Sequence, residues 1–236
     1  MNTEQQLTRY FSEVKPEKIL DIGTGTGDFL TVLKSVFTNA EFTAVDPLDS
    51  SLEEAKAKFS DVSFQKMVAE NLEFESAGFD VAAISMALHH LSDIGVALAE
   101  MKRVVKPGGW IIVNELVNDD LNAAQQVHKM LHHLRSKIDR MTGEVHNETF
   151  TKAEIIEMVT AAGINILFKF EDKKTETLVT EETEIEIKVE KLVQHIEKIA
   201  GKPEYQIMRS KIDQFRKAAL QNGFQQATRI VLVGKV

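Results

Sequence analysis

Three glycines at alternate positions form the part of the sequence whose residue types most directly suggest chemistry. The stretch reads Asp21-Ile22-Gly23-Thr24-Gly25-Thr26-Gly27 and completes an apolar run that begins at Ile19. Glycine has no Cβ, so it can adopt positive φ angles and let a ligand lie against peptide N–H groups. The pattern therefore predicts a ligand-binding turn between a strand and a helix.

A second acidic residue, Asp46, follows nineteen residues after Gly27, at the end of the apolar run 41–45. In an open parallel sheet the two strand ends are neighbours. The carboxylate can then accept hydrogen bonds from both hydroxyls of a ribose that lies across the glycine turn. The two features together predict a nucleoside site.

The spacing of the glycines favours one class of nucleoside ligand. A dinucleotide fingerprint is G-x-G-x-x-G, whereas this chain has G-x-G-x-G and places Asp28 where the fingerprint has its third glycine. A carboxylate there would repel a diphosphate but tolerate a ligand with an ammonium group and a cationic sulfur. The spacing therefore favours S-adenosylmethionine over NAD.

Four segments in the same order resemble the class I S-adenosylmethionine-dependent methyltransferases, in particular the small-molecule branch of ubiquinone- and menaquinone-type enzymes. They are the glycine turn, Val45-Asp46-Pro47, residues 68–74, and residues 79–109, which include Leu88-His89-His90-Leu91. They cover about the first half of the chain. The resemblance implies a three-layer α/β, Rossmann-like fold with a mainly parallel seven-stranded sheet whose last strand is antiparallel.

The resemblance also implies roles for individual residues. The peptide groups of Gly23 and Gly25 would face the methionine part of the cofactor, and Asp21 would hold its ammonium group. Asp46 would hold the ribose, with a helix-capping acid before Pro47 as the alternative. The predicted cofactor-binding residues are Asp21, Gly23, Gly25, Gly27, Asp46, Pro47, Ala69, Glu70, Asn71 and Ser85.

One contact of the resembled family is missing. Many members have an acid that binds the adenine amino group at the position of Val68 in this chain. The adenine is therefore assigned to the backbone of Ala69 and to Glu70 and Asn71.

Four residues are expected to lie near the methyl acceptor. His89 and His90 follow the fourth predicted strand, and a neutral imidazole could take a proton from a nucleophile. A histidine pair that only packs is the alternative. Tyr10 and Phe11 belong to a short N-terminal helix that often folds over the cofactor in the resembled family. No catalytic residue is identified.

Other histidines raise the question of a metal site. His128 and His132 are one helical turn apart and could bind a metal, but no nearby carboxylate completes a recognisable site. We therefore expect these residues and His133 to lie on a solvated helix face, with no metal bound. His146 has no assigned role.

The elements that must position these residues alternate along the chain. Apolar runs predict seven strands, at 19–22, 41–45, 64–68, 81–86, 110–116, 164–170 and 229–233. Helices are expected between them, because parallel strands require crossover connections. We expect a single methyltransferase domain, residues 1–236, with helical insertions at about 119–148 and 176–225 that cap the acceptor pocket.

Composition narrows the function classes further. The chain has 236 residues, a formal net charge of −8 and no cysteine, so thiolate metal sites and thiol catalysis are excluded. Its basic residues are scattered among acids, which argues against nucleic acid as a partner. No apolar run approaches the roughly 18 residues of a membrane span, and no secretory signal is visible at the N-terminus. A cytoplasmic protein with a small-molecule acceptor is expected, and its oligomeric state is left open.

Two other functions stay open at this point. A non-catalytic module that binds S-adenosylmethionine or S-adenosylhomocysteine would keep Asp46 and the glycine turn. A nicotinamide oxidoreductase is disfavoured by Asp28.

Overall fold

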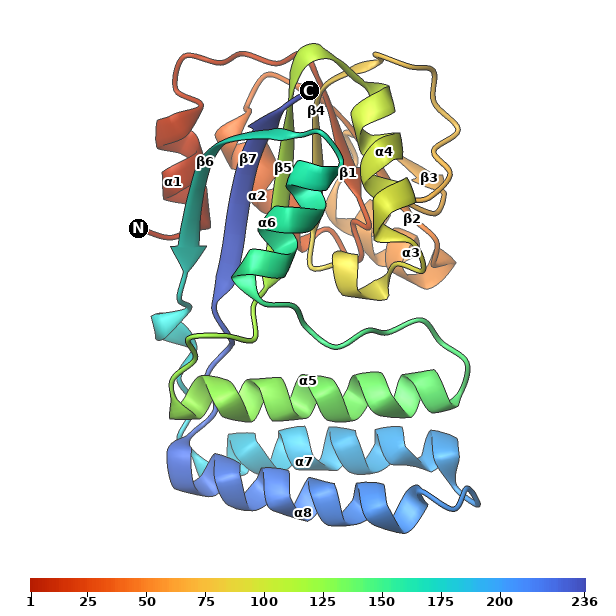
Figure 1. The fold of residues 1–236 in the computed structure, drawn as a ribbon, viewed down its shortest axis with the longest axis vertical. Helices are drawn as coiled ribbons and strands as arrows, with labels where there is room; N and C mark the ends of the chain where they lie inside the picture. The colour runs from red at the N-terminus through yellow and green to blue at the C-terminus, as the bar shows by residue number, and fades with distance from the viewer. The chain divides into compact units, whose positions relative to one another are not determined.

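The computed structural model describes the whole chain, Met1–Val236. The backbone divides into two compact units, each built from separate segments of the sequence (Figure 1). The first unit contains residues 1–115, 153–172 and 230–236, and the second contains residues 116–152 and 173–229. The expectation that the chain forms a single domain stays a prediction.

A seven-stranded sheet forms the centre of the first unit. Its strands are β1 (Lys18–Ile22), β2 (Glu41–Asp46), β3 (Val62–Lys66), β4 (Phe79–Ser85), β5 (Val105–Leu116), β6 (Asn165–Asp172) and β7 (Arg229–Lys235). Their order across the sheet is β3-β2-β1-β4-β5-β7-β6. Strands β1 to β5 pair in parallel. Strand β7 runs antiparallel to β5. The start of β5 pairs with the end of β7, as the hydrogen bond from the N–H of Gly108 to the carbonyl of Val236 shows. The predicted fold class is confirmed.

Helices pack against this sheet. They are α1 (Thr3–Tyr10), α2 (Asp28–Val36), α3 (Asp49–Lys58), α4 (Ile94–Val104) and α6 (Lys152–Ala161), and a short 3-10 helix, η1 (Leu88–His90), follows β4. Ile19 and Leu20 point to opposite faces of β1, and both are fully buried. Central strands that are buried on both faces are mostly apolar, which explains why the sequence predicted them well.

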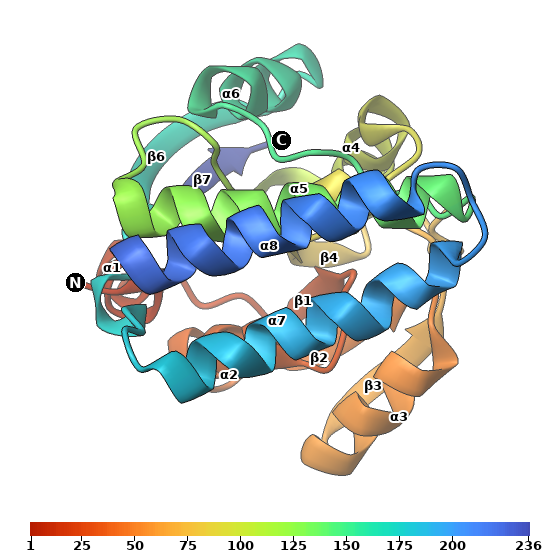
Figure 2. The same ribbon diagram turned by 90° about the horizontal axis from the view of Figure 1, so that it is seen from below.

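Three long helices form the second unit: α5 (Ala123–Met141), α7 (Glu182–Ile196) and α8 (Tyr205–Asn222). They lie side by side in Figure 2 and share one apolar core. Val127, Ile185 and Phe215 each contribute a buried side chain to that core. Short 3-10 helices, η2 (Thr175–Thr177) and η3 (Glu197–Ile199), precede and follow α7. None of the helices of the chain is both long enough and apolar enough to cross a lipid bilayer.

The structure differs from the predicted elements at several boundaries. Helix α5 begins at Ala123 rather than near Asp119, because Asn122 caps it and forms a reciprocal pair of hydrogen bonds with Gln125. Strand β5 begins at Val105 rather than at the predicted residue 110, and its register with β4 shifts near its start.

Candidate functional site

The glycine turn joins β1 to α2 at the carboxyl ends of the parallel strands. Gly23, Gly25 and Gly27 all have positive φ angles, of 65°, 54° and 86°. Two hydrogen bonds fix the turn to the end of β2: Thr24 donates its N–H to the carbonyl of Val45 at 3.0 Å, and Gly25 donates its N–H to Asp46 Oδ2 at 2.8 Å. The two predicted parts of the nucleoside site are therefore in contact.

The surroundings of the three glycines differ. A Cβ at Gly23 would lie 2.8 Å from the Cβ of Ala87, and one at Gly27 would lie 2.6 Å from the ring of Phe59. Both glycines are thus required for close packing. A Cβ at Gly25 would meet nothing within 4 Å. Gly25 therefore borders open space, where a ligand could lie on the backbone.

Replacing Gly25 with valine should weaken cofactor binding by roughly tenfold or more, which corresponds to at least about 1.4 kcal/mol. The new side chain would occupy the open space, and the left-handed backbone would add strain of about 1–2 kcal/mol to the folded state. Gly108→Val is the matched control, because Gly108 also has a positive φ and open space around it. Calorimetric titration with S-adenosylmethionine measures both variants. If the two folded variants bind S-adenosylmethionine with equal affinity, the glycine turn is not part of the cofactor site.

Asp21 is an ionisable group of the first unit that is buried without a hydrogen-bond partner. Its side chain lies at the end of β1 and is only 1% exposed, and neither carboxylate oxygen has a hydrogen-bond partner. Burial raises the pKa of Asp21 to about 7; the nearby Thr24 lowers it and the charge of Asp46 raises it further. A buried carboxylate without donors is costly unless a cation or a hydrogen-bond donor reaches it. The ammonium group of S-adenosylmethionine would supply the positive charge and the hydrogen-bond donor that the Asp21 carboxylate lacks.

Asp46 has hydrogen-bond partners on both oxygens. Besides the bond from Gly25, Oδ1 accepts the N–H of Leu48 at 2.9 Å, so the residue also shapes the turn after Pro47. Each carboxylate oxygen has a second lone pair, which leaves acceptor capacity for a ribose. Leu48 is 60% exposed beside it, an apolar surface that would suit a nucleoside base. Whether Asp46 and Pro47 contact a cofactor stays a prediction.

The segment assigned to the adenine makes a tight turn in which Asn71 donates its N–H to the carbonyl of Val68 at 3.2 Å. Ala69 is buried, and Glu70 Oε1 accepts hydrogen bonds from the N–H and the hydroxyl of Ser92 at 2.9 and 2.8 Å. Burial acts to raise the pKa of Glu70, but the hydrogen bonds outweigh it and hold the pKa below its usual range. Glu70 thus fixes the loop before α4, and its adenine role stays a prediction.

Ser85 ends β4 and contacts a residue that the sequence did not single out. Asn114 of β5 donates a hydrogen bond to Ser85 Oγ at 2.9 Å, while its own side-chain oxygen is buried without a partner. Met86 follows with a φ of 55°, an uncommon conformation for a residue other than glycine. Backbone strain of this kind is concentrated at functional sites. The carboxyl end of β4 therefore has two features typical of a site.

His89 lies in η1 and is only 3% exposed. Its Nδ1 lies 2.9 Å from Oε1 of Glu115, the other oxygen of which accepts the N–H of Leu88 at 2.9 Å. Glu115 is fully buried. An ionised carboxylate can only accept, so in the neutral imidazole the proton is on Nδ1 and Nε2 has a lone pair. The His89–Glu115 pair thus has the geometry of an oriented base.

His90 and the N-terminal aromatic residues have other surroundings. His90 is exposed, and its ring centroid lies 4.4 Å from that of His89. Tyr10 stacks on Phe168 at 4.5 Å, and Phe11 is 3% exposed within the core that α1 and α2 form on the sheet. Packing accounts for both aromatic residues. The acceptor roles of all three stay predictions.

The histidines of the second unit do not lie on a solvated face, so that expectation is wrong. His128 Nδ1 accepts the N–H of Ala227 at 2.8 Å, and burial lowers the pKa of His128 to about 4, with the charges of Arg229 and Lys188 acting in the same direction. His132 instead meets His146, the Nε2 atoms being 3.4 Å apart.

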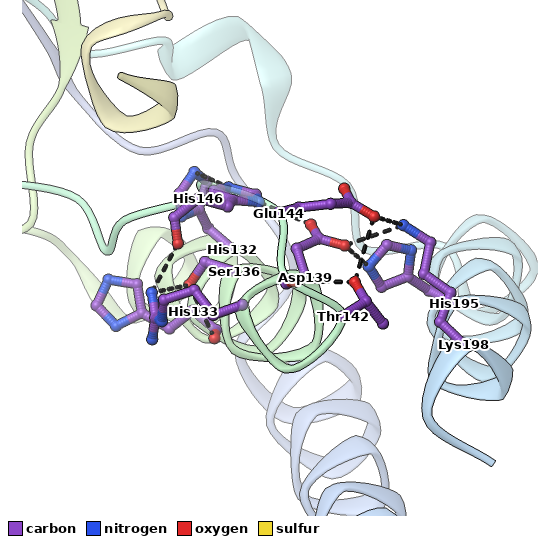
Figure 3. Close-up of polar contacts among 10 residues, drawn as sticks. His132, His133, Ser136, Asp139, Thr142, Glu144, His146, His195 and Lys198 are labelled. Carbon is purple, nitrogen blue, oxygen red and sulfur yellow. Dashed lines mark hydrogen bonds and ion pairs between the residues drawn. The ribbon is translucent and has the colours of Figure 1, made fainter. Parts of the chain in front are cut away.

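A carboxylate does lie beside these histidines, contrary to expectation. His146 Nδ1 lies 2.7 Å from Oδ2 of Asp139, a residue of α5 that is only 5% exposed (Figure 3). Asp139 Oδ1 lies 2.7 Å from His195 Nε2 and 3.1 Å from Lys198 Nζ. Burial acts to raise the pKa of Asp139, but hydrogen bonds from His146 and Lys198, together with nearby positive charge, hold it below its usual range. The i, i+7 spacing of His132 and Asp139 was the one local signal, since it places both on one helix face.

Comparison with known proteins supports the resemblance. Residues 20–113 match the family model of a methyltransferase domain, and this range contains all the predicted cofactor-binding residues. Demethylmenaquinone methyltransferase of Thermotoga maritima is 36% identical over 105 residues, which are 44% of this chain and 46% of that protein. The Staphylococcus aureus demethylmenaquinone methyltransferase is 36% identical over 120 residues, 49% of this chain and 50% of that protein. The chain spans about half the length of the curated relatives it matches.

A solved structure extends the likeness of fold to nearly the whole chain. A candidate methyltransferase of Bacillus halodurans superposes with a TM-score of 0.66, covers 99% of this chain and 98% of its own, and is 16% identical. At this identity the likeness concerns the fold alone. Together with the sequence matches, it confirms the resemblance to class I S-adenosylmethionine-dependent methyltransferases, with quinone methyltransferases among the relatives.

Proposed function

We propose that this protein is an S-adenosylmethionine-dependent methyltransferase that acts on a small organic molecule. The observation that carries the proposal is Asp21, a buried carboxylate without a hydrogen-bond partner, next to a glycine turn whose central residue borders open space. A cation in that position would remove the cost of the buried charge. The ammonium group of S-adenosylmethionine is such a cation.

The residues of the first unit would hold the cofactor along the carboxyl edge of the sheet. Asp21 would bind the ammonium group, the backbone at Gly23 and Gly25 the methionine part, and Asp46 the ribose. The turn at residues 68–71 would bind the adenine. When bound, the cofactor supplies a methyl group already activated by a sulfonium, so the protein has mainly to position the acceptor and exclude water.

The His89–Glu115 pair would act on the acceptor. Glu115 fixes the imidazole so that Nε2 of His89 can accept a proton from an oxygen, nitrogen or other nucleophile. Both residues lie at the carboxyl ends of β4 and β5, the edge at which open α/β sheets bind their ligands. We infer that His89 is the base and that Glu115 is a positioning residue.

The relatives suggest which acceptor to test first. Two of them are demethylmenaquinone methyltransferases. A reduced quinone becomes a better nucleophile when it loses a hydroxyl proton, which is the step that an oriented imidazole could assist. We propose a hydroxylated aromatic compound of this kind as the acceptor, with a cytoplasmic location as part of the same proposal.

Two measurements test this function. Calorimetric titration with S-adenosylmethionine, S-adenosylhomocysteine and NAD should give binding of the two adenosyl ligands only. Incubation with methyl-labelled cofactor and a panel of quinols, phenols and amines should then give a labelled product. Binding of NAD alone would contradict the whole proposal. Adenosyl binding without transfer to any acceptor would favour a non-catalytic binding module.

A further inference from the structure

Two imidazole rings of the second unit converge on one point. His132 comes from α5 and His146 from the loop that follows this helix (Figure 3). Their Nε2 atoms are 3.4 Å apart, their ring centroids 4.9 Å apart, and the rings are perpendicular. The nitrogen separation is long for a hydrogen bond, for which 2.7–3.2 Å is typical.

The separation fits a shared metal ion better. Two imidazole nitrogens that each lie about 2.0–2.1 Å from a tetrahedral Zn²⁺ are about 3.3–3.4 Å apart, because their bonds enclose the tetrahedral angle. The two Nε2 atoms already have this separation. Neither ring would have to move appreciably to bind the ion.

Asp139 fixes the protonation of one of the two rings. Its Oδ2 accepts a hydrogen bond from His146 Nδ1 at 2.7 Å, which leaves the lone pair of His146 on Nε2, the atom that faces His132. Lys198 and His195 contact the other oxygen and hold the carboxylate in place. A carboxylate behind a histidine is the usual outer partner of a metal-binding imidazole, which it orients and makes more basic.

The backbone around the pair is also held in place. Arg140 donates a hydrogen bond to the carbonyl of His146 at 2.7 Å. This contact ties the loop to α5 at His146. A site fixed in advance loses little conformational entropy when the ion binds.

The geometry points to a binding site for a divalent transition metal, Zn²⁺ above all, at Nε2 of His132 and Nε2 of His146, with Asp139 behind His146. Two imidazoles supply two positions of the coordination sphere. The remaining positions take water or other donor atoms.

Titration of the metal-stripped, tag-free full chain with ZnCl₂ tests this site. Calorimetry should give saturable binding of one ion per chain, and Co²⁺ should give the visible absorption of a histidine-bound complex. His132→Gln and His146→Gln should each abolish this binding. Asp139→Asn should weaken it by about 10- to 100-fold. His133→Gln is the matched control, because this neighbouring histidine contacts Thr149 instead, and it should bind as the wild type does.

Thermal unfolding separates loss of the site from loss of the fold. Zn²⁺ should raise the melting temperature of the wild type and of His133→Gln, because a ligand that binds the folded state stabilises it. It should leave that of His132→Gln unchanged while the far-ultraviolet circular dichroism stays native. Absence of saturable zinc binding in the wild type would overturn the site. So would zinc binding that persists in both the His132 and the His146 variants.

Discussion

Replacing Asp21 with asparagine should abolish the pH dependence of S-adenosylmethionine binding. Burial raises the pKa of Asp21 to about 7, so at pH 6 only about a tenth of the free protein has the ionised carboxylate that an ammonium group needs. Wild-type affinity should therefore rise roughly tenfold between pH 6 and the plateau above pH 7. The Asp21→Asn variant should bind more weakly, by roughly 1.5–3 kcal/mol for one lost charge-assisted hydrogen bond, and equally at all these pH values.

Calorimetry between about pH 5.5 and 7.5 measures this effect, below the range in which the cofactor's own amino group, with a pKa of about 7.7–8.0, loses its proton. Repeating the titration in buffers of different ionisation enthalpy should show that the wild type releases a proton on binding and that Asp21→Asn does not. A wild-type affinity that is flat over this range would mean that Asp21 does not contact the ammonium group.

The same pKa has a consequence for the stability of the ligand-free protein. The folded-state pKa is above the ordinary value of 3.8, so the folded state holds more protons than the unfolded state between about pH 4 and pH 7. The contribution of Asp21 to stability should therefore fall as pH rises through this window and stay constant above it. Asp21→Asn should be more stable than the wild type at pH 8, by roughly 2–4 kcal/mol, and no more stable near pH 4.

Replacing His89 with alanine should lower turnover by about 10²- to 10⁴-fold, the usual contribution of a positioned general base. Affinity for S-adenosylmethionine should stay nearly unchanged, because His89 is assigned to the acceptor. Added imidazole should restore part of the activity, since it can enter the space that the side chain leaves. Steady-state kinetics with an acceptor found by methyl-label screening measures each effect.

Two variants give this experiment its controls. Glu115→Gln should lower kcat less than His89→Ala does, because the imidazole of His89 is still present but less well oriented. Added imidazole should therefore not rescue this variant. His90→Ala replaces the exposed neighbour, so it should change turnover far less. Normal turnover in folded His89→Ala would show that the buried His89–Glu115 pair is structural.

The sequence predicted the sheet and the contact between the glycine turn and Asp46 well for a physical reason. Strands such as β1 and β4 are buried on both faces, so most of their residues are apolar and the strands stand out from their surroundings. The contact between the glycine turn and Asp46 follows from the topology alone, because neighbouring parallel strands end at the same edge. These features depend on local pattern and on a single rule of sheet geometry.

The partners of the histidines could not be predicted in the same way. Glu115 and Asn114 end an apolar strand, and two polar residues at such a position were a usable signal that sequence reasoning missed. Asp139 contacts His195 and Lys198 only because α5 packs against α7 and η3, and no local spacing encodes these contacts. A solvated helix face was expected for His128 and His132 because helical periodicity shows which residues share a face, but not what covers that face.

The position of β7 in the sheet has a consequence for the synthesis of the chain. This strand lies between β5 and β6, yet it is translated after every other strand. While the ribosome adds residues 117–228, β5 keeps an unpaired edge, and open edges of this kind promote pairing between nascent chains. A chain truncated before residue 229 would therefore keep the glycine turn but leave β5 and β6 without their shared partner strand. Such unpaired edges promote aggregation and make the chain a target for chaperones and proteases.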